Sequence, residues 1–341
     1  MNYATIHASP VTSDGSDLRP EFGALVSGCG VFELSTRTNF SLTGKDRVRW
    51  LNGMITNNVR DLPEGQGIYA FVLNPQGHIL GDLYACNRGE WLLIHIDHAQ
   101  TEKLLGIFRK YIIMDKVEIA DLSEKLTAIG IAGPKARDVL RAAGVDFQNL
   151  EPLQFVDVTW RATPITITHA DNPAGHSYEI SLAPQQLASV RDALISAGAV
   201  PVSPAAVELL RVASGVPRYG QDIRERDLPQ ETEQLRALNF SKGCYIGQEI
   251  VERIRSRGAV HRKFGGFAVT GPLPAPGTRI QADGKEVGEV TSAASLPLAR
   301  GDRSVALGYI RREAADAGQQ LQAGDAGLTV ASLPFAEIFA K

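Results

Sequence analysis

The chain has 341 residues, of which 44% are hydrophobic and 21% are charged, a balance typical of a globular protein with two or three domains. The formal net charge of −3, from 35 basic and 38 acidic residues, argues against a globally basic nucleic-acid binder and leaves any anion site to local residues. No apolar run approaches the roughly 18 residues of a membrane-spanning helix, and the polar N-terminus lacks signal-peptide features, so we expect a cytoplasmic protein.

Two segments share the order strand, glycine, helix. Residues 40–51 carry Gly44 after a short apolar strand, and residues 129–140 carry Gly133 followed by Pro134. Proline is tolerated at the first position of a helix, where its missing N–H has no helical partner. Two ordinary strand–turn–helix units would account for the pattern, and so would a split α+β domain built from two related halves.

The segment between these units has the pattern of a hairpin, a further strand and a helix. Apolar runs at 68–73 and 79–85 flank the turn-forming residues 74–77, which indicates a β-hairpin. Residues 91–96 form another apolar run. Leu104, Leu105 and Phe108 then recur at helical spacing, which predicts a helix over residues 99–112.

Strands and helices continue after residue 155. We expect strands at 164–169 and 177–182, a helix at 184–197 that ends at Gly198, and a helix from 203 to about 214 capped by Gly215. Beyond about residue 260 we expect strands at 263–270, 279–282, 286–292, 305–310 and 328–333. Asp283-Gly284 is a strong signal for a tight hairpin turn, and these strands together predict a small β-barrel.

The three cysteines lie far apart, at Cys29, Cys86 and Cys244. An odd number without a CxxC pair suits a reducing compartment and argues against a disulfide framework. One such chain does not supply the four thiolates of a typical iron–sulfur cluster, so we expect no metal site within one chain. We interpret Cys29 and Cys86 as structural.

Cys244 stands in the octapeptide Lys-Gly-Cys-Tyr-Ile-Gly-Gln-Glu, residues 242–249, at or just before the start of an expected helix. A helix N-terminus and the nearby Lys242 both lower a thiol pKa and favour the nucleophilic, metal-binding thiolate. A buried structural cysteine is the alternative, and the polar, glycine-rich flanks favour a functional one. Further motif residues allow close backbone approach or suit the positive end of the helix dipole: Gly243, Gly247, Gln248 and Glu249.

The octapeptide resembles the signature of the YgfZ-type folate-binding proteins, which are relatives of the glycine-cleavage aminomethyltransferase. Residues 51–58, 210–222 and 228–231 resemble further blocks of that family, and the likeness covers about residues 25–335. The resemblance implies an α+β fold of split ferredoxin-like α/β domains, arranged as a three-domain ring with a C-terminal β-barrel. We expect a split folate-binding domain at 1–50 and 122–245, a second α+β domain at 51–121, and the barrel domain at 246–341.

The resemblance also implies a tetrahydrofolate or folate-derivative cofactor, and a role in assembly or repair of iron–sulfur enzymes, including radical enzymes that modify tRNA. A pterin ring needs a carboxylate that accepts two hydrogen bonds and a flat apolar wall, and its glutamate tail needs cations. Glu179 resembles the pterin-binding glutamate of the aminomethyltransferases; a strand glutamate facing water is the alternative. The other candidates are Arg211 for a tail carboxylate, Tyr219 or Tyr245 for a ring face, and Asp82 for a cofactor contact.

Two positions depart from the aminomethyltransferase pattern. The acidic pair of that family appears here as Gly81-Asp82, and the glutamate of its arginine block appears as Ala213. We therefore expect an accessory factor rather than a conventional enzyme. Its reactive Cys244 would lie at the rim of the folate pocket and hold a transient iron–sulfur cluster with a partner, react, or dock a client enzyme. A tetrahydrofolate-dependent aminomethyltransferase or demethylase-like one-carbon enzyme is the first alternative.

An RNA- or protein-binding adaptor is the second alternative. It would use a locally basic stretch, which also suits the tail of a polyglutamated folate: Arg253, Arg255, Arg257, His261, Arg262 and Lys263. No aromatic residues interleave with these cations as they do in single-strand binders, so a solvated helix end is the simpler interpretation. The expected partners are thus iron–sulfur client enzymes and a folate, without a membrane.

Overall fold

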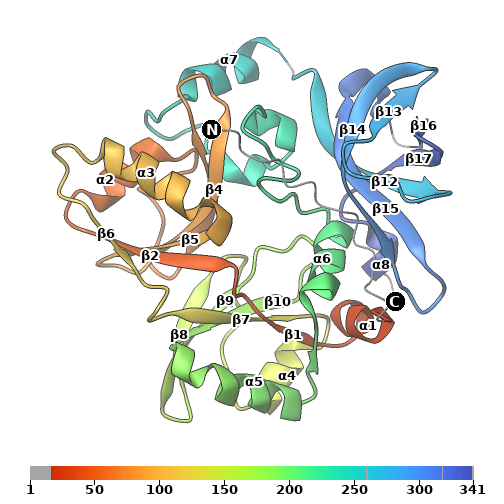
Figure 1. Cartoon of the computed structure of the whole chain (residues 1–341). Coiled ribbons are helices and arrows are strands. Elements are labelled where there is room, and N and C mark those ends of the chain that lie inside the picture. The colour runs from red at the N-terminus through yellow and green to blue at the C-terminus, as the bar shows by residue number, and fades with distance from the viewer. Residues whose placement is uncertain (1–16, 259, 317, 340–341) are drawn as a thin grey trace.

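The computed structural model describes residues 17–258, 260–316 and 318–339, and three bodies surround a common centre in it (Figure 1). Two bodies are α+β units with one sheet each, and the third is a closed β-barrel. The α+β class and the three-domain ring predicted from the sequence are confirmed. No helix in the described ranges is long and apolar enough to cross a membrane.

The first sheet has six strands in the order β11–β1–β7–β10–β9–β8, and all neighbours are antiparallel except β1 and β11. Helices α4 (Ala136–Ala142) and α5 (Leu187–Ser196) bury Leu140 and Leu194 against it. Its central strand β7 is almost wholly apolar because both faces are covered. The strands are β1 (Gly30–Glu33), β7 (Thr127–Ala132), β8 (Phe155–Trp160), β9 (Thr163–His169), β10 (Ser177–Leu182) and β11 (Val200–Pro201).

The second sheet has five strands in the order β3–β4–β5–β2–β6. Helices α2 (Arg47–Met54) and α3 (Thr101–Tyr111) pack Leu51, Leu104 and Phe108 against one face. The opposite face is directed toward the centre of the ring and carries alternate residues of β4. The strands are β2 (Arg37–Thr43), β3 (Gly67–Leu73), β4 (Ile79–Asn87), β5 (Leu92–Asp97) and β6 (Glu118–Asp121).

The barrel closes in the order β12–β15–β14–β13–β16–β17, with β17 paired back to β12. Asp283 and Gly284 join β13 to β14 with φ values of 49° and 73°, the two positive angles that a tight type I′ hairpin turn requires. The strands are β12 (Arg262–Thr270), β13 (Arg279–Ala282), β14 (Lys285–Leu296), β15 (Arg303–Arg311), β16 (Gln320–Ala323) and β17 (Ala326–Ala331).

The remaining helices join the three bodies. Helix α6 (Pro204–Ala213) packs Leu209 and Val212 on the barrel and Leu210 on the first sheet, beside α1 (Arg19–Ser27). Helix α7 (Gln248–Arg257) covers the β3–β4 hairpin, and α8 (Ala336–Phe339) lies at the C-terminal end. The short 3-10 helices are His98–Gln100, Pro184–Gln186, Pro229–Thr232, Leu235–Ala237 and Arg312–Ala314.

The two strand–glycine–helix units occupy equivalent places in different sheets. Gly44 (φ +94°) follows β2 and Gly133 (φ +122°) follows β7. A Cβ at Gly44 would lie 2.1 Å from the carbonyl oxygen of Lys116, and one at Gly133 would lie 2.5 Å from that of Gly28. Both glycines are therefore required by conformation and by space.

Sheet membership differs from the domain boundaries expected from the sequence. The chain passes from the first sheet to the second between Glu33 and Arg37, whereas the expected boundary lies at residue 50. Helix α7 packs through Val251 on the β3–β4 hairpin, so the barrel begins at β12 rather than at residue 246. Hydrogen bonding across the sheet decides where a strand belongs, and its partner is not visible in the local pattern.

Candidate functional site

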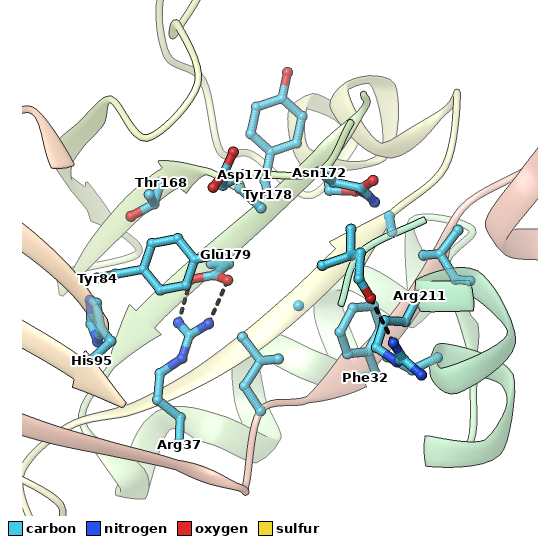
Figure 2. A pocket seen from close by; sticks show the side chains of 18 of the residues that line it. Phe32, Arg37, Tyr84, His95, Thr168, Asp171, Asn172, Tyr178, Glu179 and Arg211 are labelled. Carbon is cyan, nitrogen blue, oxygen red and sulfur yellow. Dashed lines mark hydrogen bonds and ion pairs between the residues drawn. The ribbon is translucent and has the colours of Figure 1, made fainter. Parts of the chain in front are cut away.

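A cavity of about 200 Å³ lies where the two sheets meet helix α6. Its walls come from β1, β7, β9 and β10 of the first sheet and from β2, β4 and β5 of the second, and α6 closes one side (Figure 2). Two rings supply flat apolar surface, those of Phe32 and Tyr84, whereas the ring of Tyr178 packs in the core on the other face of the first sheet (Figure 2). Such a lining, mostly apolar with a few placed polar groups, is typical of a small-molecule site.

Glu179 lies in this cavity and is held by Arg37. Arg37 Nη2 donates to Glu179 Oε1 at 2.6 Å, and Nη1 donates to Oε2, so that the pair is bidentate (Figure 2). The two side chains are 18% and 20% exposed. Burial alone would raise the pKa of Glu179, but the charge and hydrogen bonds of Arg37 outweigh it and hold that pKa below its usual range. Glu179 is therefore an ionised carboxylate.

His95 is a neutral acceptor on the same wall. The side-chain amide of Asn39 donates through Nδ2 to the carbonyl oxygen of Leu126, so its Oδ1 accepts from His95 Nδ1 at 2.7 Å. This network leaves Nε2 of His95 without a proton. Burial, and then the positive charge of Arg37, lower the pKa of His95 to about 3, which keeps the imidazole uncharged.

Ser214 adds a buried hydroxyl. It is 1% exposed, and within the described ranges its Oγ has no hydrogen-bond partner. It borders this cavity and also a separate hollow on the barrel side, lined by Phe264 and Leu333. Buried hydroxyls are normally satisfied, so Ser214 has an unused donor and acceptor for a ligand.

Arg211 borders the cavity, but its side chain is fully engaged within the protein. Its Nε and Nη2 donate to Glu208 at 2.9 and 2.7 Å, Nη1 donates to Asp222 at 2.7 Å and to the Val216 carbonyl at 2.6 Å, and Nη2 also donates to Ser292 at 2.9 Å. All five N–H donors of the guanidinium are thus used. Arg211 ties α6 to the barrel and has no donor left for a tail carboxylate.

Asp82 is partly buried on β4, on the same strand face as Tyr84, and does not line the cavity. Tyr69 Oη and Gln100 Nε2 donate to its carboxyl group at 2.6 and 2.7 Å. Burial raises its pKa, and the two hydrogen bonds oppose that rise. A Cβ at the preceding Gly81 would lie 2.7 Å from Gln100 Oε1 and 2.8 Å from Leu104 Cδ2, so a second acid there does not fit without rearrangement.

The two candidate tyrosines lie away from the cavity lining. Lys103 Nζ donates to Tyr219 Oη at 2.6 Å and lies 4.5 Å from the centroid of that ring. Tyr245 is buried in an apolar cluster with Phe71 and Ile79 at the β3–β4 hairpin. The ring faces that the cavity does offer are those of Phe32 and Tyr84.

Lys242 holds the cysteine loop to the second sheet's helix. Its Nζ donates to the carbonyl oxygens of Asn52, Ile55 and Asn57 at 2.6, 2.6 and 2.7 Å, so all three N–H bonds of the ammonium are used. Cys244 is exposed, three residues before Gly247, which caps α7. Lys242 therefore anchors the loop to helix α2 and the residues that follow it, and its ammonium group is not free to contact the Cys244 thiol.

Gly247 seats the same loop on the β3–β4 turn. It has φ +82°, and a Cβ there would lie 2.6 Å from the carbonyl oxygen of Asn74. Gln248 accepts from the Tyr245 N–H through its side chain at 3.3 Å, whereas Gly243 and Glu249 are exposed. Cys244 thus lies near the turn end of β3 and β4, and it is not among the residues of the cavity, at whose rim we had expected it.

Residues of the basic stretch have different contacts. Arg262 donates to Asp227 and Glu231 at 2.7 and 2.9 Å, which joins β12 to the segment before α7. Arg255 stacks over Phe240, 4.6 Å from the ring centroid, while Arg253 is exposed. Within the described residues, no cluster of three or more His, Cys, Asp or Glu side chains is placed to hold a metal ion.

Three features of the cavity were not found from the sequence: Arg37, His95 and Ser214. Arg37 and Glu179 are 142 residues apart, and each is the single charged residue of its strand. No short-range pattern links them, because their pairing depends on how the two sheets meet.

The chain resembles known proteins over most of its length. A family model described as the GCVT N-terminal domain matches residues 12–242, and one described as the CAF17 C-terminal β-barrel domain matches residues 258–336. Among solved structures, glycine cleavage system aminomethyltransferase T from Bartonella henselae superposes with a TM-score of 0.82 at 22% identity, covering 93% of this chain and 89% of that one. This similarity shows the fold.

Several relatives by sequence have names. An aminomethyltransferase of Rubrobacter xylanophilus is 29% identical over 300 residues, which is 87% of this chain and 80% of the relative. One from Nostoc is 28% identical and covers 90% of this chain and 83% of its own length. A putative chloroplastic transferase of Arabidopsis thaliana is 27% identical over 309 residues, 89% of this chain and 70% of the relative.

Proposed function

Because this chain belongs to the GCVT N-terminal domain family and ends in a barrel of the CAF17 type, we propose that it is a tetrahydrofolate-binding accessory factor for iron–sulfur enzymes. The relationship to YgfZ-type proteins predicted from the octapeptide is confirmed by the two matched domains. Membership of this family supports folate binding. The assembly or repair of clusters in client enzymes, including those that modify tRNA in the cytoplasm, is the finer part of the proposal.

The single observation that carries folate binding is the ionised Glu179 in a cavity with aromatic walls. A carboxylate accepts both N–H groups that a pterin presents along one edge, and Phe32 and Tyr84 supply flat surfaces for its ring. The unpartnered hydroxyl of Ser214 suits a further polar atom of the ring. The residues present therefore fit a pterin.

The glutamate tail needs a different place from the one expected at Arg211. A second cavity of about 810 Å³ shares Ala132, Asn172 and Ser177 with the first, so the two are adjacent. Arg19 and Arg300 line this second cavity, although Arg19 is already paired with Asp302 at 2.9 Å. In this proposal the pterin lies against Glu179 and the tail extends toward these cations.

The exposed Cys244 supports the accessory role. The buried Lys242 and Tyr245 hold its loop on both sides. The exposed thiol is therefore presented on a fixed loop. In the proposal this thiolate acts on a client, by holding a transient cluster with the partner's ligands, by reacting, or by docking.

Titration calorimetry with 5-formyltetrahydrofolate tests the proposed folate binding. The wild-type protein should bind, and Glu179→Gln should weaken binding at least about tenfold, because the amide accepts at one atom instead of two. Glu33→Gln is the control: this exposed carboxylate on β1 pairs with Arg191 at 2.9 Å, and its change should leave affinity as it is. Absence of wild-type binding would sink the proposal.

Complementation tests whether the Cys244 thiol is needed for the accessory role. Cells that lack the protein receive the Cys244→Ala variant, and the activity of iron–sulfur enzymes that modify tRNA is measured. Failure of a variant that still folds and binds the folate supports the proposal. Full rescue means that Cys244 is dispensable, and it removes the thiol from the mechanism.

A one-carbon transferase is the second candidate, because the named relatives include aminomethyltransferases. It would require turnover of an aminomethyl or N-methyl donor, lost in Asp82→Asn. Asp82 is partly buried against Tyr69 and Gln100, and a second acid at Gly81 would require the side-chain ends of Gln100 and Leu104 to move, so the observations favour the accessory role.

A further inference from the structure

The contact between Arg37 and Glu179 has the geometry of a ligand contact. A guanidinium presents two parallel N–H bonds from an N–C–N unit, and both carboxylate oxygens of Glu179 receive one each. The pyrimidinone edge of a pterin carries the same unit, a ring N–H beside an amino group on one carbon. The arginine therefore makes the two-point contact that a pterin would make, with the same acceptor atoms and direction of approach.

The size of the cavity agrees with this correspondence. Its volume of about 200 Å³ is below the roughly 300–1,000 Å³ of most ligand pockets. Arg37 itself lines the cavity and projects into it from the first residue of β2 (Figure 2). Withdrawal of this long side chain would add volume at the place where Glu179 becomes free.

Nothing else described in the cavity neutralises Glu179. His95 is held neutral through Asn39, and Arg211 has all its donors engaged elsewhere. A ligand that bound Glu179 with Arg37 in place would find both carboxylate oxygens already taken along that edge. Arg37 thus supplies the positive charge that stabilises the Glu179 carboxylate and also blocks a ligand from reaching it.

We propose that Arg37 occupies the pterin subsite as an internal competitor, so that a folate binds Glu179 only after the Arg37–Glu179 pair opens. This inference rests on the proposed folate-binding function and adds its regulation. The apparent affinity is then reduced by the small fraction of molecules in which the pair is open. Removing the guanidinium should make the cavity available in every molecule.

The test is titration calorimetry of wild type and Arg37→Met with 5-formyltetrahydrofolate, and with pterin lacking a tail. We expect about tenfold tighter binding of both ligands by the variant, and most of the gain in the association rate. The direction of the change in folate affinity distinguishes removal of a competitor from loss of a favourable charge. A folate carries carboxylates, so loss of a nearby cation by itself would weaken binding.

Two further variants complete the experiment. Arg37→Lys retains the charge but makes only a one-point contact, so it should bind with an affinity between the other two. Arg224→Met is the matched control, since it breaks another partly buried pair, with Glu289 at 2.6 Å, away from the cavity. It should leave folate affinity unchanged.

Thermal unfolding supplies an independent readout. Without ligand, Arg37→Met should melt below wild type, because Glu179 loses its partner, and its rise in Tm on adding folate should exceed that of wild type. If wild type binds folate and Arg37→Met binds equally or more weakly, the inference is wrong and folate binding stands. If neither protein binds, both proposals fail. If Arg37→Met does not fold, Arg37→Lys decides.

Discussion

Arg37 and Glu179 form a charge pair whose strength depends on pH. The folded-state pKa of Glu179 is depressed below the usual 4.5, because Arg37 outweighs burial. An acid with a depressed folded-state pKa contributes stability that is complete above its unfolded pKa and is lost as pH falls through the folded one. The pair should therefore stabilise the protein fully at neutral pH and progressively less below about pH 4.5.

This dependence can be measured by urea unfolding of wild type and Arg37→Met between pH 7 and pH 3. We expect the difference in unfolding free energy between the two proteins to shrink as pH falls. The decline begins where Glu179 takes up a proton in Arg37→Met, in which burial raises its pKa, and it continues until the carboxylate of the wild type is protonated. Removal of Arg37 also relieves part of the depression of the His95 pKa, which acts in the same direction, and groups away from the cavity cancel in the difference. A difference that grows toward acid pH would contradict the assignment.

Lys242 offers a second prediction for a single side chain. It is 8% exposed, and Lys242→Met would leave three buried carbonyl oxygens without their donor. We expect a loss of about 3 kcal/mol in the free energy of unfolding. Lys103→Met is the comparison, since that ammonium is a third exposed and should cost no more than about 1 kcal/mol.

At the scale of elements, local patterns predicted most of the strands and helices. The 68–85 hairpin, the helix of α3 and the Asp283–Gly284 turn are all present, because their signals lie within a few residues. The short β16 was missed, since its alternation lasts only four residues. The cavity could not be assembled in the same way, because Arg37 and Glu179 come together through the placement of two sheets. Family resemblance supplied Glu179, and it supplied Arg211 for a role that its neighbours do not permit.

Gly247 provides a test at the start of α7. Gly247→Ala should cost about 2–3 kcal/mol, from the left-handed backbone and from the clash with the Asn74 carbonyl oxygen. Gly284→Ala is a matched control with φ +73° and open space around the new Cβ, so only the conformational cost of about 1 kcal/mol applies. Urea unfolding of the two variants separates the conformational cost from the cost of the clash. Equal losses of unfolding free energy in both variants would refute close packing at Gly247.

At the scale of the whole molecule, Arg211 connects the bodies of the ring. It joins α6 to the buried Asp222 and to Ser292 of the barrel. Arg211→Met leaves Asp222 without its guanidinium partner, which should cost about 3–5 kcal/mol. This loss of stability weakens the contact between the barrel and the rest of the chain.

The tryptophans allow this uncoupling to be observed. Trp50, Trp91 and Trp160 all lie outside the barrel strands, so their fluorescence follows the two sheets, whereas circular dichroism follows the whole chain. Urea transitions by the two methods should coincide in wild type and separate in Arg211→Met. Arg191→Met, at an exposed pair with Glu33, should leave them coincident, and coincidence in Arg211→Met would contradict this role.

The Arg37–Glu179 pair also bears on when the protein acquires its ligand in the cell. A buried carboxylate that needed a ligand to offset its charge would tie maturation of the chain to the vitamin supply. Here the chain provides its own counter-charge, so a newly made protein can reach its native state during folate starvation and be loaded later. Its occupancy would then follow the free folate concentration, and the number of active molecules would report nutritional state without any change in protein abundance.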